Sequence, residues 1–390
     1  AERIERAVVA GVPRRAMVVA AIARRRVTEP WLGLSLVLVL LLLLGWAIRP
    51  RVTLTVTLFL AAISDQVTVT WFPFTKNLSS RESISYLADA VTISPIDIVL
   101  GSGALIACMR AYATSGHVLP RSPLTRPMIV FTLFVAFGFV RGVVMGGGDL
   151  RVAVFEGRAM FYIPLVFAIT AHECTELRHL RAPLFGILAG VVVQSLLSIQ
   201  YLGTLTPGQR DSLDSLNEHG AALGHNLMIL VFAAFLLLKV RQPLVRPVLA
   251  LALVPTVYVV FVSQRRAGIA ALLVAGVMLA VALFWHRRRA FWLIVPVVVV
   301  VLTGYVGAFW NSSSSAAFPA QAVKSIIAPD SASAEDRSSD EYRQIEAYDL
   351  NVTIRSSPVL GLGFGQPFLR PIPLPDISFF EMNAYLSHNA

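Results

Sequence analysis

The sequence has little charge and almost no lysine. Only 14% of its 390 residues are charged and 56% are hydrophobic, and Lys76, Lys239 and Lys324 are its only lysines. The mean hydropathy is +0.69. A soluble domain of this length does not need so apolar a composition for its core. The shortage of charge therefore excludes a soluble globular protein and predicts an integral membrane protein.

Cysteines and metal-binding motifs are also scarce. Cys108 lies inside an apolar run, Cys174 stands beside His172, and the two form no CxxC pair. This pattern excludes a disulfide framework and does not support a zinc site. His219 and His225 do not share a helical face, which favours packed histidines over a shared metal. No HExxH, GxSxG or Asp-x-Asp motif occurs, so we expect neither a metal nor another cofactor.

Long hydrophobic runs dominate what is present. A helix of roughly 17 to 25 apolar residues crosses a hydrocarbon core of about 30 Å. The sequence therefore predicts an all-α polytopic membrane protein with spans at 31–48, 52–70, 87–109, 126–145, 156–172, 182–200, 220–239, 244–262, 267–285 and 290–308. The second is the weakest, because Ser64, Asp65 and Gln66 interrupt it. We divide the chain into a basic segment, 1–30, a transmembrane domain, 31–308, and a large loop, 309–390.

The formal charge of +10 is carried mainly by arginine, and its placement predicts an orientation. Arginine-rich connections fall on one side when the spans alternate, at 110–126, 178–181, 239–246 and 286–289. The positive-inside rule makes this side the cytoplasm, with the large loop facing outward. We expect the basic charge to meet anionic membrane lipids rather than nucleic acid.

The basic segment 1–30 would suit an interfacial helix on the cytoplasmic face. One conflict remains, because two full crossings at 31–48 and 52–70 would place this segment outside. Either the weak second span does not cross, or a further crossing is hidden in the sequence.

The large loop holds the longest polar segment. Its Ser/Ala-rich part, from Asn311 to about Ser339, predicts a mobile loop. Apolar residues then recur at helical spacing and predict an amphipathic helix over 341–355 along the membrane surface, ended by Pro358. Prolines at 367, 371, 373 and 375 predict extended structure up to an apolar stretch at 379–386.

Two adjacent arginines break the charge rule of the short connections. The turn before Gly268 joins two spans on the outward side, yet it contains Arg265 and Arg266. Guanidinium groups stay protonated and grip phosphate oxygens through a bidentate fork, which suits an anion such as the diphosphate of a lipid carrier. Snorkelling to headgroup phosphates is the alternative.

Three other polar residues are candidates for the same site. Arg210, in another outward connection, could bind the same anion or pair with neighbouring acids. Arg343 has Glu346 three residues on as its default partner. His388 is the type of side chain that can take a proton from a hydroxyl near neutral pH, although a lone histidine is more often structural.

Three short motifs, in order, resemble the O-antigen ligase and polymerase superfamily of bacterial cell-envelope glycosyltransferases. They are the segment from Gln264 to Gly268 that opens a span, Arg343 with Glu346-Ala347 and then Pro358 to Gly363, and Ser387-His388-Asn389. The chain departs from the family pattern in lacking a tryptophan near Glu346 and in having Arg265 where the family has serine. The spans that the family has after His-Asn are missing, which predicts a truncated chain and twelve spans in the intact protein.

The resemblance implies a GT-C-like fold that transfers a glycan from a polyprenyl (undecaprenyl or decaprenyl) diphosphate carrier. The acceptor would be a hydroxyl of a glycan, lipid or protein on the outer face of the bacterial cytoplasmic membrane. It implies that the catalytic residues are His388, Arg266 and Arg343. It implies that the substrate-binding residues are Arg265, Arg210, Asn389, Gly361 and Gly363. Neither a metal nor a nucleotide cofactor is implied.

Two other functions fit parts of the sequence. A transporter or flippase for a lipid-linked anion would also want outward arginines, but it predicts inverted repeats and broken helices. A metal-dependent membrane glycosyltransferase would need acids in its first outer loop, where only Asp65 is offered. Ligase versus polymerase, the identity of the glycan and the oligomeric state stay open.

Overall fold

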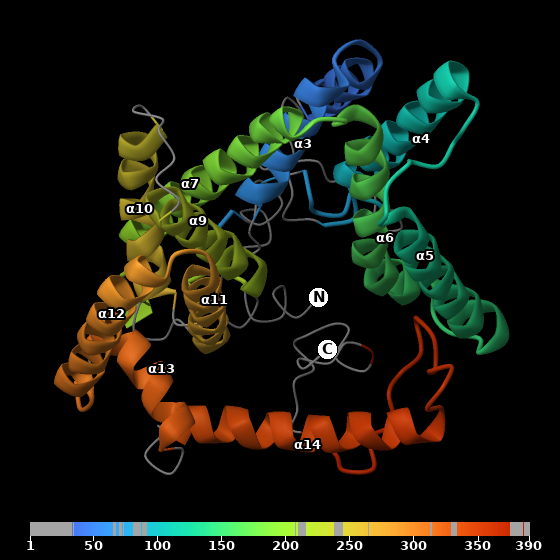
Figure 1. The fold of residues 1–390 in the computed structure, drawn as a ribbon. Helices are drawn as coiled ribbons and strands as arrows, with labels where there is room; N and C mark the ends of the chain where they lie inside the picture. The colour runs from blue at the N-terminus through green and yellow to red at the C-terminus, as the bar shows by residue number, and fades with distance from the viewer. Residues whose placement is uncertain are drawn as a thin grey trace, which may run out of the picture.

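The computed structural model describes residues 33, 35–64, 68–69, 72, 74–80, 87, 92–206, 208–209, 216–237, 245–263, 265–312, 314–328, 334–374 and 385. All regular elements within these residues are helices (Figure 1). They are an apolar helix Ser35–Ile48, α3 (Pro50–Ile63), α4 (Pro95–Ser115), α5 (Thr125–Phe139), η1 (Val140–Met145), α6 (Leu150–Glu173), η2 (Leu177–Leu180), α7 (Arg181–Thr204), α9 (His219–Leu237), α10 (Val245–Val262), α11 (Arg266–His286), α12 (Arg288–Phe309), η3 (Ser315–Ala317), α13 (Phe318–Ile327) and α14 (Ala334–Ser356).

Eight helices of the described chain are long and apolar enough to cross a membrane. They lie at Pro95–Ser115, Thr125–Met145, Leu150–Glu173, Leu177–Thr204, Gly220–Leu237, Val245–Val262, Arg266–His286 and Arg288–Phe309. Each coincides with one of the last eight expected spans. The prediction of an all-α, polytopic membrane protein is confirmed.

The first two apolar segments form shorter helices. Ser35–Ile48 and α3 fall below the length of the other spans, and α3 ends at Ile63, where Ser64 interrupts the apolar run. A helix of 14 residues, the length of α3, is only about 21 Å long, less than the hydrocarbon core of about 30 Å. The helix found at the expected span 52–70 is therefore shorter than this span, because it ends at Ile63.

These two short helices form a hairpin with its corner at Arg49 and Pro50. A Cβ atom on Gly45 would lie 2.5 Å from Thr53 Oγ1, whereas eight residues of a straight helix span about 12 Å. Two arginines fasten the corner to the ends of α4 and α6. Arg110 donates to the carbonyl of Ala47, and Arg51 Nε donates to the carbonyl of Glu173 at 2.7 Å.

α3 continues from this corner in parallel with α7. Gly186 on α7 approaches the backbone of Thr55, and Gly190, one turn further on, approaches that of Phe59. Small residues four apart allow helix backbones to approach closely. α7 begins at the α6–α7 connection, and α3, which runs parallel to it, begins at the corner of the hairpin. The corner therefore lies at the same end as this connection, and both free ends of the hairpin lie away from it. Residues 1–30 lie outside the described residues, so their side of the membrane stays a prediction.

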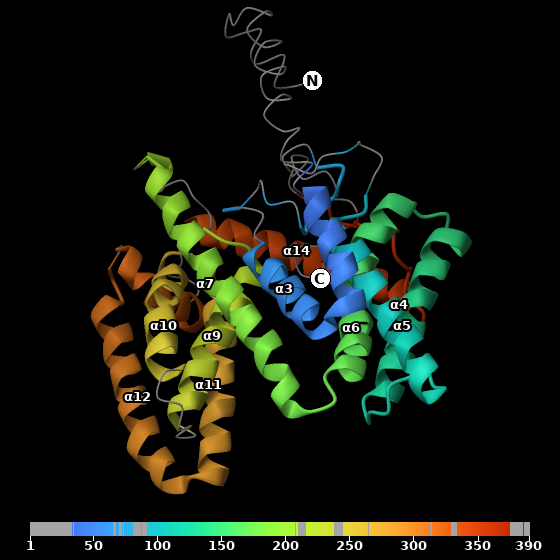
Figure 2. The ribbon, with the colours of Figure 1, turned by 90° about the horizontal axis from the view of Figure 1, so that it is seen from above.

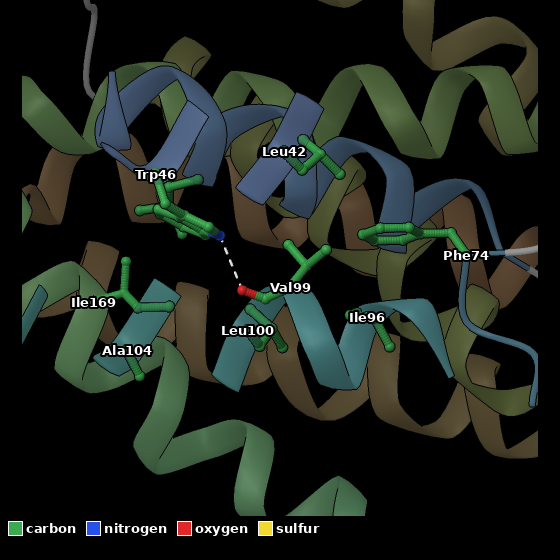
Figure 3. Packing of buried hydrophobic residues seen from close by; sticks show 9 residues of the cluster. Leu42, Trp46, Phe74, Ile96, Val99, Leu100, Ala104 and Ile169 are labelled. Carbon is green, nitrogen blue, oxygen red and sulfur yellow. Dashed lines mark hydrogen bonds between the residues drawn. The ribbon is translucent and has the colours of Figure 1, made fainter. Parts of the chain in front are cut away.

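The largest buried cluster holds the hairpin against α4 and α6. Trp46 is 1% exposed, and its indole Nε1 donates to the carbonyl of Val99 at 2.9 Å (Figure 3). Leu42, Leu54 and Ile169 pack in the same cluster. The ring of Trp46 lies directly on α4 because Gly103 carries no side chain there.

We expect Gly103→Ala to destabilise the protein by about 1 to 3 kcal/mol, because its Cβ would lie 2.5 Å from the rigid Trp46 ring. Gly101→Ala on the same helix is the matched control, since a Cβ there meets nothing within 4 Å. Thermal unfolding of the purified protein in detergent measures both. Equal melting temperatures for the two variants would contradict this account of the core.

The long helices form two groups that α3 and α7 join (Figure 1). One group contains α4, α5 and α6, and the other contains α9 to α12. The α6–α7 and α11–α12 connections both lie toward the bottom of Figure 2, at separate places, and α14 lies nearer the opposite end. We call these the connection end and the loop end. α14 crosses at the loop end from the α12–α13 side to the α5 side (Figure 1).

Candidate functional site

The arginine turn, comprising Ser263, Arg265 and Arg266, joins α10 to α11 at the loop end. Arg265 has an extended backbone, with φ −93° and ψ 95°, and Arg266 is the first residue of α11. The α7–α9 connection fastens the turn from one side. Leu216 N donates to Ser263 O at 3.3 Å, and Arg265 Nε donates to Asn217 O at 2.7 Å.

The arginine turn concentrates positive charge. Both arginines are half-buried, and the first turn of α11 has no acidic residue and no side-chain cap. The unpaired N–H groups of a helix N-terminus attract anions, and the guanidinium groups add full charges beside them. Asn226 Nδ2 donates to Gly268 O at 2.8 Å and ties this first turn to α9. The arrangement can stabilise an anion such as a phosphate or diphosphate.

The start of the large loop packs directly on this turn. Ala322 of α13 lies in one buried cluster with Val260 and Ile269, which flank the turn. Gln321 Nε2 donates to three carbonyls at the end of α12, those of Phe309, Trp310 and Ser312, at 3.0 to 3.1 Å. The predicted mobile loop from 311 to 339 is thus wrong in part, because α13 and the first turn of α14 form within it. Alanine favours helix, and small buried residues let α13 lie close to α10 and α11.

α14 carries the second group of candidate residues. It spans Ala334–Ser356, so the helix expected over 341–355 is confirmed and begins one to two turns earlier. Arg343 is exposed, whereas Glu346, three residues further along the helix, is fully buried. Burial raises the pKa of the Tyr342 phenol, and the nearby Glu346 carboxylate raises it further. Glu346 thus contributes to the inner face of α14, and Arg343 points outward.

The segment after α14 returns along the helix. Leu369 N donates to Thr353 Oγ1 at 2.9 Å, and Ile372 N donates to Asp349 Oδ1 at 3.2 Å. Ile372 follows Leu369, whereas its partner Asp349 precedes Thr353. The segment therefore runs antiparallel to α14, back toward the middle of the helix. His388 and Asn389 follow this segment, but they lie outside the described residues, as does Arg210.

A glycine latch, residues 361–365, lies between α14 and this returning segment. Its three glycines have positive φ, of 65° at Gly361, 91° at Gly363 and 75° at Gly365. The latch docks on α5, η1 and α6, away from the arginine turn. A Cβ on Gly363 would overlap the backbone nitrogen of Gly142 and lie 2.6 Å from its Cα. The ring of Phe364 lies against Gly138 and Gly157.

Main-chain hydrogen bonds fix the latch on both sides. Phe364 N donates to Gly138 O at 3.1 Å, and Gly365 O accepts from Asp149 N at 2.9 Å. Side chains complete the docking, because Glu156 Oε2 accepts from Gly365 N at 2.6 Å and Arg141 Nε donates to Gly361 O at 2.6 Å. The positive φ values of the three glycines are ones that residues with a side chain rarely adopt. The observed close approach is to helix backbone, so substrate binding by Gly361 and Gly363 stays a prediction.

The sequence reasoning missed the receiving half of the latch. Gly138, Gly142 and Gly146 recur every fourth residue, the small-xxx-small pattern of close helix contacts in membranes, and this signal was available. Arg141 lies between them in the π-helical turn η1, a type of distortion common at functional positions. The sequence pattern alone predicts no role for Arg141, because the residue lies within an expected span.

The described residues contain no group of three or more His, Cys, Asp or Glu side chains that could hold a metal ion. Of the candidate residues, the structure brings the arginine turn into contact with α13, and the chain continues from α13 through α14 to the latch. Arg343 stands on the exposed face of the connecting helix.

Residues 251–389 match the family model described as O-Antigen ligase. No curated protein and no solved structure matches the chain. The matched segment begins in α10, contains the arginine turn, α13, α14 and the latch, and ends at Asn389. The match confirms the resemblance inferred from the three motifs. The C-terminal part of this multi-pass membrane protein is therefore similar to the O-antigen ligase family, which supports a general role in the processing of cell-envelope glycans.

Proposed function

We propose that the protein is a glycosyltransferase that moves a glycan from a polyprenyl diphosphate carrier to an acceptor hydroxyl. It would act as a ligase or a polymerase on the outer face of the bacterial cytoplasmic membrane. One observation carries the proposal. The segment that matches the O-antigen ligase family contains both Arg266, on the arginine turn, and His388, beyond the returning segment.

The division of labour follows from the chemistry of the residues. The acceptor oxygen attacks the anomeric carbon of the donor sugar, and the bond from this carbon to the diphosphate oxygen breaks. Negative charge grows on the departing polyprenyl diphosphate, where Arg266, Arg265 and the N-terminus of α11 would stabilise it. Arg210 would add a further positive charge.

The acceptor hydroxyl must lose its proton during the same step. His388 would take this proton, with Asn389 orienting the acceptor. Arg343 and the glycine latch would shape the large loop over the donor. The diphosphate activates the donor, so the reaction needs no nucleotide. Partners would be the lipid-linked glycan, the acceptor and membrane lipids.

The test is transfer by the purified chain in detergent or proteoliposomes, from a defined polyprenyl diphosphate-linked glycan to a defined acceptor. A single product size supports ligation, and a ladder of sizes supports polymerisation. Glycan that crosses the bilayer of proteoliposomes while still attached to its carrier, with no transferred product, would instead support a flippase.

Treatment with EDTA is expected to leave the transfer rate unchanged, because the arginine turn supplies the positive charge that a metal ion would otherwise supply. The measurement compares initial rates with EDTA, without it, and with Mg²⁺ or Mn²⁺ added back. Loss of transfer that a divalent ion restores would show that the mechanism depends on a metal.

A further inference from the structure

A row of buried polar side chains runs from α7 to the arginine turn. Gln194 and Ser198 lie one turn apart on α7, and Asn217 lies in the α7–α9 connection, each at most 1% exposed. Gln194 Nε2 donates to Ser198 Oγ at 3.1 Å, and Ser198 Oγ donates to Asn217 Oδ1 at 3.0 Å. We call these three residues the polar seam.

The polar seam ends on one of the two arginines. The main-chain oxygen of Asn217, whose side chain Ser198 holds, accepts the hydrogen bond of Arg265 Nε at 2.7 Å. The neighbouring Leu216 N donates to Ser263 O in the same turn. Two bonds thus tie the arginine turn to a connection that the seam fixes on α7.

Polar side chains inside an apolar helix group have a cost that calls for a reason. Burying an amide or hydroxyl costs free energy unless hydrogen bonds compensate. Within the described part of the chain, Asn217 Nδ2 is buried and has no hydrogen-bond partner. The hydrogen bonds within the seam offset part of this cost, and they hold the Asn217 side chain against α7.

We propose that Asn217, held by Ser198 and Gln194, is a positioning residue that fixes the Arg265 guanidinium for the diphosphate of the lipid carrier. This inference rests on the proposed function. An arginine side chain loses considerable rotamer entropy when it is held in one geometry. Because the seam already holds Arg265 in the folded protein, this entropy is lost on folding and not on binding. The affinity for the diphosphate is therefore higher.

α7 provides a matched pair of serines for the test. Ser195 and Ser198 are both fully buried, and the hydroxyl oxygen of each lies 2.8 Å from the carbonyl oxygen four residues earlier. Only Ser198 also bonds to Asn217. Ser198→Ala is expected to weaken binding of undecaprenyl diphosphate by the full-length chain in detergent by about three- to tenfold, the effect of one lost hydrogen bond. Ser195→Ala is expected to bind as the unaltered chain does.

Two further measurements separate positioning from general damage. Binding of undecaprenol, which lacks the diphosphate, is expected to be equal in all variants, and melting temperatures report folding. Asn217→Ala combined with Ser198→Ala is expected to cost no more than the larger single effect, because both remove the same bond. Equal loss in Ser195→Ala and Ser198→Ala, or equal loss for undecaprenol, would overturn the proposal.

Arg266→Ala separates this inference from the proposed function. If Arg266→Ala leaves diphosphate binding intact, the proposed function itself fails. If Arg266→Ala weakens binding but Ser198→Ala and Asn217→Ala do not, only the positioning role of the seam fails.

Discussion

Replacing Arg266 by alanine is expected to lower the rate of glycan transfer by about a hundred- to a thousandfold. Removing one preorganised group that stabilises charge in a transition state typically has an effect of this size. Arg266 begins α11, so in the proposed mechanism the positive end of the helix and Arg265 would stabilise the same anion. Single-turnover transfer from a defined polyprenyl diphosphate-linked glycan measures the effect.

Two variants control for charge and for folding. Arg266→Lys keeps the charge but loses the bidentate fork, so we expect an intermediate rate. Arg289→Ala removes an exposed arginine at the start of α12, at the connection end, and is expected to transfer normally. Transfer by Arg266→Ala at the rate of Arg289→Ala would remove the arginine turn from the mechanism.

His388→Ala is expected to lose transfer to a similar extent for a different reason. Loss of a general base costs about a hundred- to ten-thousandfold in rate, but it leaves the diphosphate contacts in place. We therefore expect this variant to bind undecaprenyl diphosphate with unchanged affinity, whereas Arg266→Ala binds it more weakly. The same loss of affinity in both variants would contradict the separation of roles.

Gly363→Ala is expected to detach the glycine latch and to lower transfer by at least about tenfold. The added Cβ would overlap the backbone of Gly142, which cannot move aside as a flexible side chain could, and φ at Gly363 is 91°. Correct placement of a loop over a reacting centre contributes strongly to rate, because small displacements of reacting groups are costly. Hydrogen exchange of the amides of Phe364 and Gly365 reports detachment, since both are hydrogen-bonded in the docked state.

Gly361→Ala is the matched control for backbone strain. Its φ is 65°, so alanine there costs about 1 to 2 kcal/mol, but the nearest atom to the new Cβ is 4.0 Å away. The difference between the two variants isolates the contact with Gly142. If both variants retain slow exchange and normal transfer, the latch is not needed for activity.

Most of the transmembrane layout could be predicted from the sequence. Span length and apolarity are local properties, and eight expected spans match helices in the structure. The end of α14 before Pro358 was also predictable, because the residue before proline avoids the helical region. α13 was missed because it has only ten residues and follows a serine- and alanine-rich stretch whose composition is typical of a loop.

The candidate site was predictable only as separate pieces. The sequence by itself determined that two arginines open α11, that a polar loop follows α12, and that glycines with free φ stand in this loop. The charge of the arginines and the conformational freedom of the glycines depend on residue type alone, so both can be read from the sequence.

Only the tertiary structure decided which pieces meet. Arg141 and Gly361 are 220 positions apart, and Asn217 links Ser198 to Arg265. Such contacts depend on how closely helix backbones approach and on which buried polar groups need partners. Neither property is contained in the local pattern of apolar and polar residues that defines a membrane span.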